Sequence, residues 1–189
     1  TGYNVDSFGH NGMLPQILQQ SGMKYYVFHR PSDQEKPGVD HIFYWQSPDG
    51  SRVLAYKIPL GYGASNPARL ASQIDQVAQI GKKLHLDMMF FYGVGNHGGG
   101  PTIALLNEIE KLRRQPGFYH IKYSSPPAFM KSIEEKNPDL QVLADDLQHH
   151  AIGWYSAMLK VKKPNRPAEQ RPLAGERLQT VDQWLFWGQ

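Results

Sequence analysis

The sequence contains no cysteine among its 189 residues. This absence excludes a disulfide scaffold and every metal site built on thiolates. Histidine, aspartate and glutamate are then the strong metal ligands that remain to the chain. Any metal centre should therefore be sought where these residue types meet.

The chain also lacks an excess of one charge and any long apolar run. It has 20 basic and 17 acidic residues, interspersed, for a net charge of +3, which does not indicate a nucleic-acid surface. No apolar segment approaches the roughly 20 residues that a bilayer span needs. We expect a soluble globular protein without nucleic-acid or membrane partners, with a cytoplasmic location favoured and a homo-oligomer left open. The sequence opens at Thr1 almost directly on an expected strand, which suggests a truncated N-terminus.

Strand-like and helix-like segments alternate along the first 140 residues. Hydrophobic residues make up 40% and aromatic residues 12% of the chain, enough to form a core. Alternating strands and helices predict an α/β fold with a mostly parallel sheet, and an Asp-Gly turn at 47–51 predicts one hairpin. The expected strands are 3–6, 25–29, 41–45, 52–57, 87–92 and 118–123, and the expected helices begin near Met13, Leu70 and Ile103.

The composition changes after residue 140. Helical patterns continue in parts of 158–187, but Pro164, Pro167 and Pro172 should interrupt them. We therefore predict two regions, a partial α/β domain at 1–140 and a loop followed by the start of a helical domain at 141–189.

A glycine-rich loop at 93–102 allows several interpretations. Gly93, Gly95 and Gly98 satisfy the G-x-G-x-x-G pattern of dinucleotide-binding folds, but that fold also needs an acidic residue at the end of the next strand, where Ser124-Ser125 stand. An esterase oxyanion loop would need a G-x-S-x-G nucleophile motif, which is missing. The glycines could otherwise let the backbone approach a ligand or form a tight turn.

The segment Asp6-Ser7-Phe8-Gly9-His10 and the adjacent pair His149-His150 are the strongest candidates for chemistry. An acid at the end of a strand, joined by distant histidines, can build a metal site that also performs carboxylate chemistry. The alternatives are that Asp6 caps the following helix, and that the two histidines form a surface pair. Trp45 could stack on a sugar ring or belong to the core.

Four ordered motifs together resemble the glycoside hydrolase family 38 α-mannosidases. The first is the segment 6–18, in which Leu14-Pro15-Gln16-Ile17-Leu18 follows Asp6. The others are the hairpin at 43–54, the loop at 92–102 and Leu147-Gln148-His149-His150. The resemblance implies a retaining, exo-acting enzyme that removes terminal α-linked mannose. It also implies one zinc ion in a (β/α) barrel-like domain, followed by a helical bundle, and makes this chain an internal part of a larger protein.

The same resemblance assigns roles to individual residues. Asp6 matches the family's nucleophile and zinc ligand, and His150 matches a zinc ligand. Apart from the resemblance, we expect substrate contacts from His10, Trp45 and His149, and the position of His10 in the turn after Asp6 also predicts that it orients Asp6. Asn96 stands where some members carry the aspartate that protonates the leaving group, and an amide cannot donate that proton. His97 is then a candidate donor, with Asp145 and Asp146 as alternatives; otherwise the whole protein should be slow on unactivated substrates.

Two family zinc ligands belong upstream of Asp6 and are not in this sequence. We therefore expect the isolated chain to be inactive. A different hypothesis is a carbohydrate- or metal-binding relic whose catalysis was lost through Asn96. A dinucleotide-binding domain is the remaining and least favoured alternative.

Overall fold

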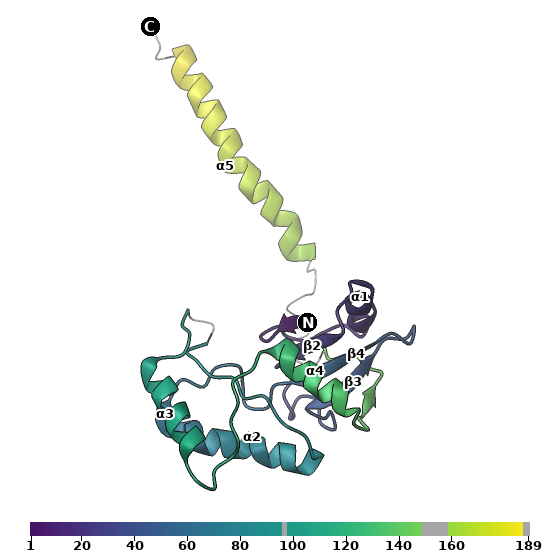
Figure 1. Cartoon of the computed structure of the whole chain (residues 1–189). Helices are drawn as coiled ribbons and strands as arrows, with labels where there is room; N and C mark the ends of the chain where they lie inside the picture. Colours follow the sequence, from purple (N-terminus) through teal and green to yellow (C-terminus); the bar gives the residue numbers. More distant parts are fainter. Residues whose placement is uncertain (96–97, 149–158, 187–189) are drawn as a thin grey trace. The chain divides into compact units, whose positions relative to one another are not determined.

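In the part of the chain that the computed structural model describes, residues 1–95, 98–148 and 159–186, the strands form one five-stranded sheet of order β1-β2-β4-β3-β5 (Figure 1). The pairs β1–β2, β2–β4 and β3–β5 are parallel, and β3–β4 is antiparallel. The mostly parallel α/β fold predicted from the sequence is thus confirmed. The strands are β1 (Gly2–Asn4), β2 (Tyr25–Phe28), β3 (Ile42–Gln46), β4 (Arg52–Lys57) and β5 (Val142–Leu143).

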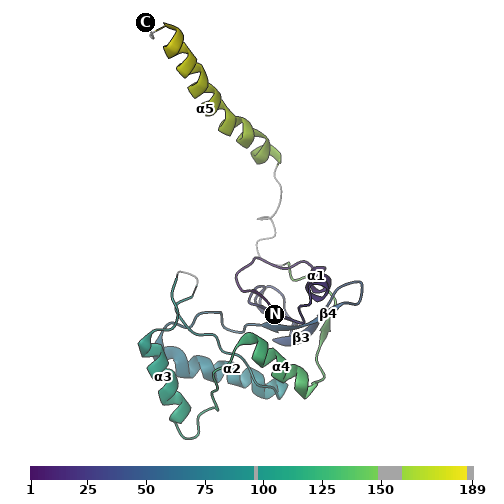
Figure 2. The same ribbon diagram turned by 45° about the horizontal axis from the view of Figure 1, so that its top comes forward.

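Each face of the sheet is covered by one short helix, and Figure 2 shows α1 (Leu14–Gln20) and α4 (Pro126–Lys136) on its opposite sides. Side chains alternate between the faces because successive strand residues point in opposite directions. Tyr26 and Phe28 of β2 pack with Leu18 of α1. Val27, between them, packs in the cluster that contains Met130 of α4. The strand pattern thus divides the core into two clusters.

A third apolar cluster lies between α2 (Leu70–Leu84) and α3 (Ile103–Arg114), with a short 3-10 helix, η1 (Pro67–Arg69), ahead of α2. Leu70 and Ile74 face Leu105 and Ile109 across it. The Thr102 hydroxyl accepts a hydrogen bond from the Leu105 amide at 3.2 Å. This N-cap starts α3 directly after the glycine-rich loop.

The predicted hairpin is confirmed. The Ser47 amide donates to the Ser51 carbonyl at 2.9 Å, and the Gly50 amide donates to the Ser47 carbonyl at 2.9 Å. Gly50 has a φ of +85°, a conformation that favours glycine.

The predicted strands at 87–92 and 118–123 are wrong. The apolar residues of 87–92 pack on two sides, with Phe91 in the cluster under the sheet and Phe90 and Tyr92 in the α2–α3 cluster. This two-sided packing gives 87–92 a strand-like pattern without a neighbouring strand. In 118–123, Phe118, Tyr119 and Ile121 all pack in the α2–α3 cluster. Because no strand precedes the glycine-rich loop, the strand–loop–helix context of a dinucleotide site is missing too.

Three elements of the described residues were not predicted: η1, α4 and β5. β5 pairs with β3, so it belongs to the first compact unit, Thr1–Ala151. A boundary at residue 140 would separate this strand from its sheet.

The second unit, Ile152–Gln189, contains the helix α5 (Leu159–Phe186). The helix is continuous through Pro164, Pro167 and Pro172, where the sequence predicted interruptions. Each proline removes one amide donor, while the residues around it keep the helical backbone. No helix within the described residues has the length and hydropathy of a membrane span.

Candidate active site

Asp6 follows β1 and has an exposed side chain, with 43% of its surface accessible. Its Oδ1 accepts a hydrogen bond from Nε of Arg30 at 3.2 Å. This bond, a hydrogen bond from Tyr62 and the positive charge of Arg30 together lower the pKa of Asp6 against a smaller effect of desolvation. Asp6 is therefore an ionised carboxylate at neutral pH, held in place but open to solvent.

Asp6 does not cap the following helix. The N-cap position of α1 is Met13, without a side-chain cap, and the Met13 amide donates to Oδ1 of Asn11 at 2.8 Å. The alternative structural explanation for Asp6 is therefore wrong, and its carboxylate is engaged with Arg30 and Tyr62 instead.

His10 lies in the core, with 4% of its surface exposed. Its Nε2 is 2.9 Å from the Arg30 carbonyl and its Nδ1 is 2.9 Å from the Tyr26 hydroxyl. The carbonyl can only accept, so we assign the proton to Nε2 and the acceptor role to Nδ1. Burial lowers the pKa of His10 to about 4, so the ring is neutral.

The burial of His10 argues against the substrate contact predicted for it. Its hydrogen bond to the Arg30 carbonyl connects it with the residue that holds Asp6. The expected influence of His10 on Asp6 would then pass through the backbone of Arg30.

Trp45 also belongs to the core. It is fully buried, and its Nε1 donates to the Asp145 carbonyl at 2.9 Å. Stacking on a sugar needs an exposed ring face, so the burial of Trp45 argues against the substrate contact predicted for it.

The Asp6 motif lies against the segment that precedes the histidine pair. The Leu147 amide donates to the His10 carbonyl at 2.9 Å, and the His10 amide donates back to the Leu147 carbonyl at 3.3 Å. Gly9 permits this approach, because a Cβ there would lie 2.7 Å from Cα of Gln148. His149 and His150 lie outside the described residues. The contact therefore consists of residues up to Gln148.

The glycine-rich loop packs beside the segment that carries Tyr62. The Gly93 amide donates to the Ala64 carbonyl at 3.0 Å, and a Cβ on Gly63 would lie 3.1 Å from Cα of Gly95. The two backbones therefore pack so closely that a side chain at Gly63 would press on Gly95. Asn96 and His97, the predicted positions for proton transfer, lie outside the described residues.

Asp6 is the one predicted zinc ligand that the structure describes, and an exposed, ionised carboxylate suits a divalent cation. Within the described ranges, no group of three or more His, Asp or Glu residues could hold a metal ion. Of the alternative proton donors, Asp145 forms an ion pair with Lys36 at 2.6 Å, and Asp146 accepts a hydrogen bond from the Gln148 amide at 3.3 Å.

Sequence reasoning missed both Arg30 and Tyr62 as contacts of Asp6. Neither lies in a recognisable motif with Asp6, because each comes from a different connection of the sheet. A single arginine after a predicted strand carries no signal that it reaches a carboxylate elsewhere.

Comparison with known proteins gives consistent results. Residues 1–156 match the family model of the glycosyl hydrolases family 38 N-terminal domain. The chain is 30% identical over 171 residues to mouse alpha-mannosidase 2C1, covering 87% of this chain and 16% of that protein. It is 28% identical over 177 residues to alpha-mannosidase G of Dictyostelium discoideum, covering 92% of this chain and 16% of that protein.

A solved structure shares the fold. The crystal structure of an alpha-mannosidase from Enterococcus faecalis superposes with a TM-score of 0.55 at 20% sequence identity, over 77% of this chain and 17% of that one. The chain thus corresponds to a small part of each relative.

Proposed function

The chain belongs to glycosyl hydrolase family 38, as part of its N-terminal domain, and we propose that the protein containing it is an α-mannosidase that removes terminal α-linked mannose with retention of configuration. The observation that carries the proposal is the exposed, ionised carboxylate of Asp6, held by Arg30 and Tyr62. It lies on the motif that contacts residues 147–148, directly before the histidine pair.

Asp6 would act as the nucleophile. Its carboxylate attacks the anomeric carbon as the bond to the leaving group breaks, giving a glycosyl ester that water then hydrolyses. A nucleophile must be ionised and accessible, and the lowered pKa and the exposure of Asp6 meet both conditions. Two displacements at the same carbon produce net retention.

Zinc is the proposed cofactor, with Asp6 and His150 as ligands from this chain and further ligands from the rest of the protein. Bound zinc would coordinate sugar hydroxyls and favour distortion of the sugar ring toward the oxocarbenium-like transition state. The role of the chain's own residues is to hold the carboxylate of Asp6 between Arg30 and Tyr62, where it can meet both sugar and metal.

His97 is the proposed proton donor to the leaving group. Asn96 has no proton of suitable acidity. The carboxylate of Asp145 is engaged in an ion pair with Lys36. We further infer that the sheet is part of a barrel-like domain, and that α5 begins a helical bundle completed by the rest of the protein.

The proposal is tested by hydrolysis of 4-nitrophenyl α-mannoside with the full-length protein, before and after chelation and with zinc restored. We expect turnover that is lost on chelation and recovered with zinc, and an α-configured product by NMR. Asp6→Asn should lower kcat on the order of 1,000-fold or more, because it removes the nucleophile.

Asp139→Asn is the matched control, since it neutralises an exposed aspartate elsewhere in the chain. An inverted product, or an Asp6→Asn variant as active as Asp139→Asn, would contradict the proposal. A folded, zinc-loaded protein that binds mannose without turnover would point to the binding relic.

A further inference from the structure

The segment 29–41 connects β2 to β3 and carries Arg30, whose guanidinium contacts Asp6. The Arg30 carbonyl is held by His10, and Pro31 is buried. Ser32 and Glu35 then form a turn, in which the Ser32 amide donates to Oε2 of Glu35 at 2.8 Å. The position of the Arg30 guanidinium therefore depends on how this connection is attached to the sheet.

Lys57, the last residue of β4, attaches the connection at two points. Only 2% of its surface is exposed. Its Nζ lies 2.6 Å from Oδ1 of Asp33 and donates to the Val39 carbonyl at 2.7 Å. Both acceptors belong to the segment 29–41, so one buried cation joins its two halves to the end of β4.

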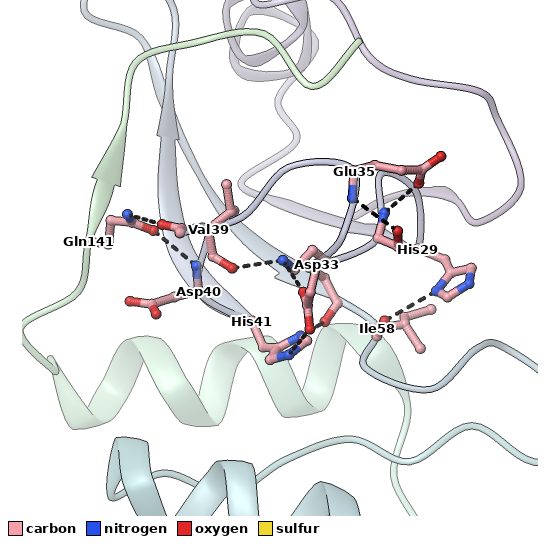
Figure 3. Close-up of polar contacts among 11 residues, drawn as sticks. His29, Asp33, Glu35, Val39, Asp40, His41, Ile58 and Gln141 are labelled. Carbon is pink, nitrogen blue, oxygen red and sulfur yellow. Dashed lines mark hydrogen bonds and ion pairs between the residues drawn. The ribbon is translucent and has the colours of Figure 1, made fainter. Parts of the chain in front are cut away.

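His41 completes the cluster, and Figure 3 shows its ring beside the carboxylate of Asp33. Its Nδ1 is 2.8 Å from the Lys57 carbonyl, and its Nε2 is 3.5 Å from Oδ2 of Asp33. Desolvation opposes ionisation of Asp33, but the hydrogen bond and charge of Lys57 outweigh it and lower the pKa of Asp33. Lys57 and Asp33 are therefore an ion pair at neutral pH.

Gln141 holds the distal end of the same segment. Its Nε2 donates to the Gly38 carbonyl at 2.8 Å, and its Oε1 accepts from the Asp40 amide at 3.0 Å (Figure 3). Asp33 is closer to Arg30 in the sequence than Gly38 and Asp40 are. The chain between Arg30 and Asp33 can span no more than about 10 Å. The contact with Lys57 thus restrains the half of the connection that carries the arginine.

The ion pair is better explained by the position that it gives the segment 29–41 than by a gain in folding stability. Burying a lysine costs solvation free energy, and apolar replacements of buried ion pairs are often neutral or stabilising. The neighbouring β4 residues Val53, Ala55 and Tyr56 are buried, so an apolar side chain would suit the end of this strand. A cation there specifies where an acidic residue of the connection must lie.

We propose that Lys57 and Asp33 are positioning residues for the nucleophile: their ion pair places the segment 29–41 so that Arg30 orients the carboxylate of Asp6. The inference rests on the proposed function, because it assigns the ion pair a part in that reaction. The path runs from Lys57 through Asp33 to Arg30 and ends at Asp6, without contact between Lys57 and the sugar.

The experiment compares Asp33→Asn, Asp33→Glu and Asp87→Asn in the full-length protein, with kcat and KM for 4-nitrophenyl α-mannoside measured separately. Asp33→Asn should lower kcat about 10- to 100-fold with little change in KM, because a nucleophile displaced by about 1 Å loses rate rather than binding. Asp33→Glu should recover much of kcat, since the largely exposed Asp33 leaves room for a longer carboxylate.

Asp87→Asn is the control, because Asp87 forms an ion pair of the same 2.6 Å length with Lys136 on the surface. Circular dichroism and the thermal midpoint establish that each variant is folded. If Asp33→Asn fails to fold, Lys57→Met with Asp33→Asn removes both charges together and should show the same kcat loss.

Equal kcat values for Asp33→Asn and Asp87→Asn would overturn the inference while leaving the proposed function intact. A loss that Asp33→Glu does not recover would also overturn it, because it would mean that the charge is not what matters. A wild-type protein without α-mannosidase activity would instead contradict the proposed function, and this inference with it.

Discussion

His10 is a neutral imidazole surrounded by aromatic rings. Tyr26, Phe28 and Trp45 meet it edge-on, with ring centroids 5.1 to 6.2 Å away. Burial in this setting opposes a positive charge and lowers the pKa to about 4 from an ordinary value of 6.5. His10, which lies in the motif connected with catalysis, thus also contributes to the stability of the folded chain.

This lowered pKa predicts how stability depends on pH. The unfolded chain binds a proton at His10 below about pH 6.5, whereas the folded chain resists it down to about pH 4. Stability should therefore fall as the pH is lowered through this window, by about 3 kcal/mol for this residue. Urea unfolding of wild type and His10→Gln between pH 4 and 8 measures the difference.

We expect the stability advantage of wild type over His10→Gln to shrink toward pH 4. His41 has a lowered pKa as well, mainly through desolvation, but it is present in both proteins and cancels in the comparison. An advantage that stays constant with pH would show that His10 titrates alike in both states.

At the scale of elements, the contact between the Asp6 motif and residues 147–148 depends on Gly9. Its φ is +146°, and a Cβ would lie 2.9 Å from the Leu147 carbonyl oxygen. A side chain here must push apart the segment that carries Asp6 and residues 147–148.

Gly9→Ala should therefore lower both stability and α-mannosidase activity of the full-length protein. Gly22→Ala is the control, since Gly22 also has a positive φ, of +75°, but nothing lies within 4 Å of its added Cβ. We expect Gly22→Ala to lose only about 1 kcal/mol through backbone strain and to keep its activity. Thermal midpoints and kcat separate the two, and equal effects would contradict a steric role for Gly9.

The elements also show what the sequence could predict. The hairpin and α1 to α3 follow local rules, such as the Asp-Gly turn and helical spacing of apolar residues. The segment at 87–92 has the alternation of a strand but packs between two clusters, and no local rule indicates whether a ladder partner exists. Asp6 was found because its motif is contiguous, whereas Arg30 and Tyr62 reach it only through the tertiary fold.

At the scale of the molecule, this chain covers 16% of the length of mouse alpha-mannosidase 2C1. The described residues contribute Asp6 alone to the proposed zinc site, and that site needs several ligands. We expect the isolated chain to show no hydrolysis of 4-nitrophenyl α-mannoside and to bind zinc far more weakly than the full-length protein.

Zinc titration calorimetry and the hydrolysis assay, run on both proteins, test this expectation. Asp6→Asn in the full-length protein is the internal control, because it should weaken zinc binding without removing the other ligands. Activity of the isolated chain comparable to that of the full-length protein would show that residues 1–189 hold the whole site.

The backbone pair between His10 and Leu147 also determines when the site can form. It joins the beginning of the first unit to its end, so forming it closes a long loop at a cost in conformational entropy. During synthesis, the motif around Asp6 leaves the ribosome before residues 147–148 do. Contacts of such wide sequence separation form slowly, and we expect the proposed nucleophile to reach its final environment late in folding.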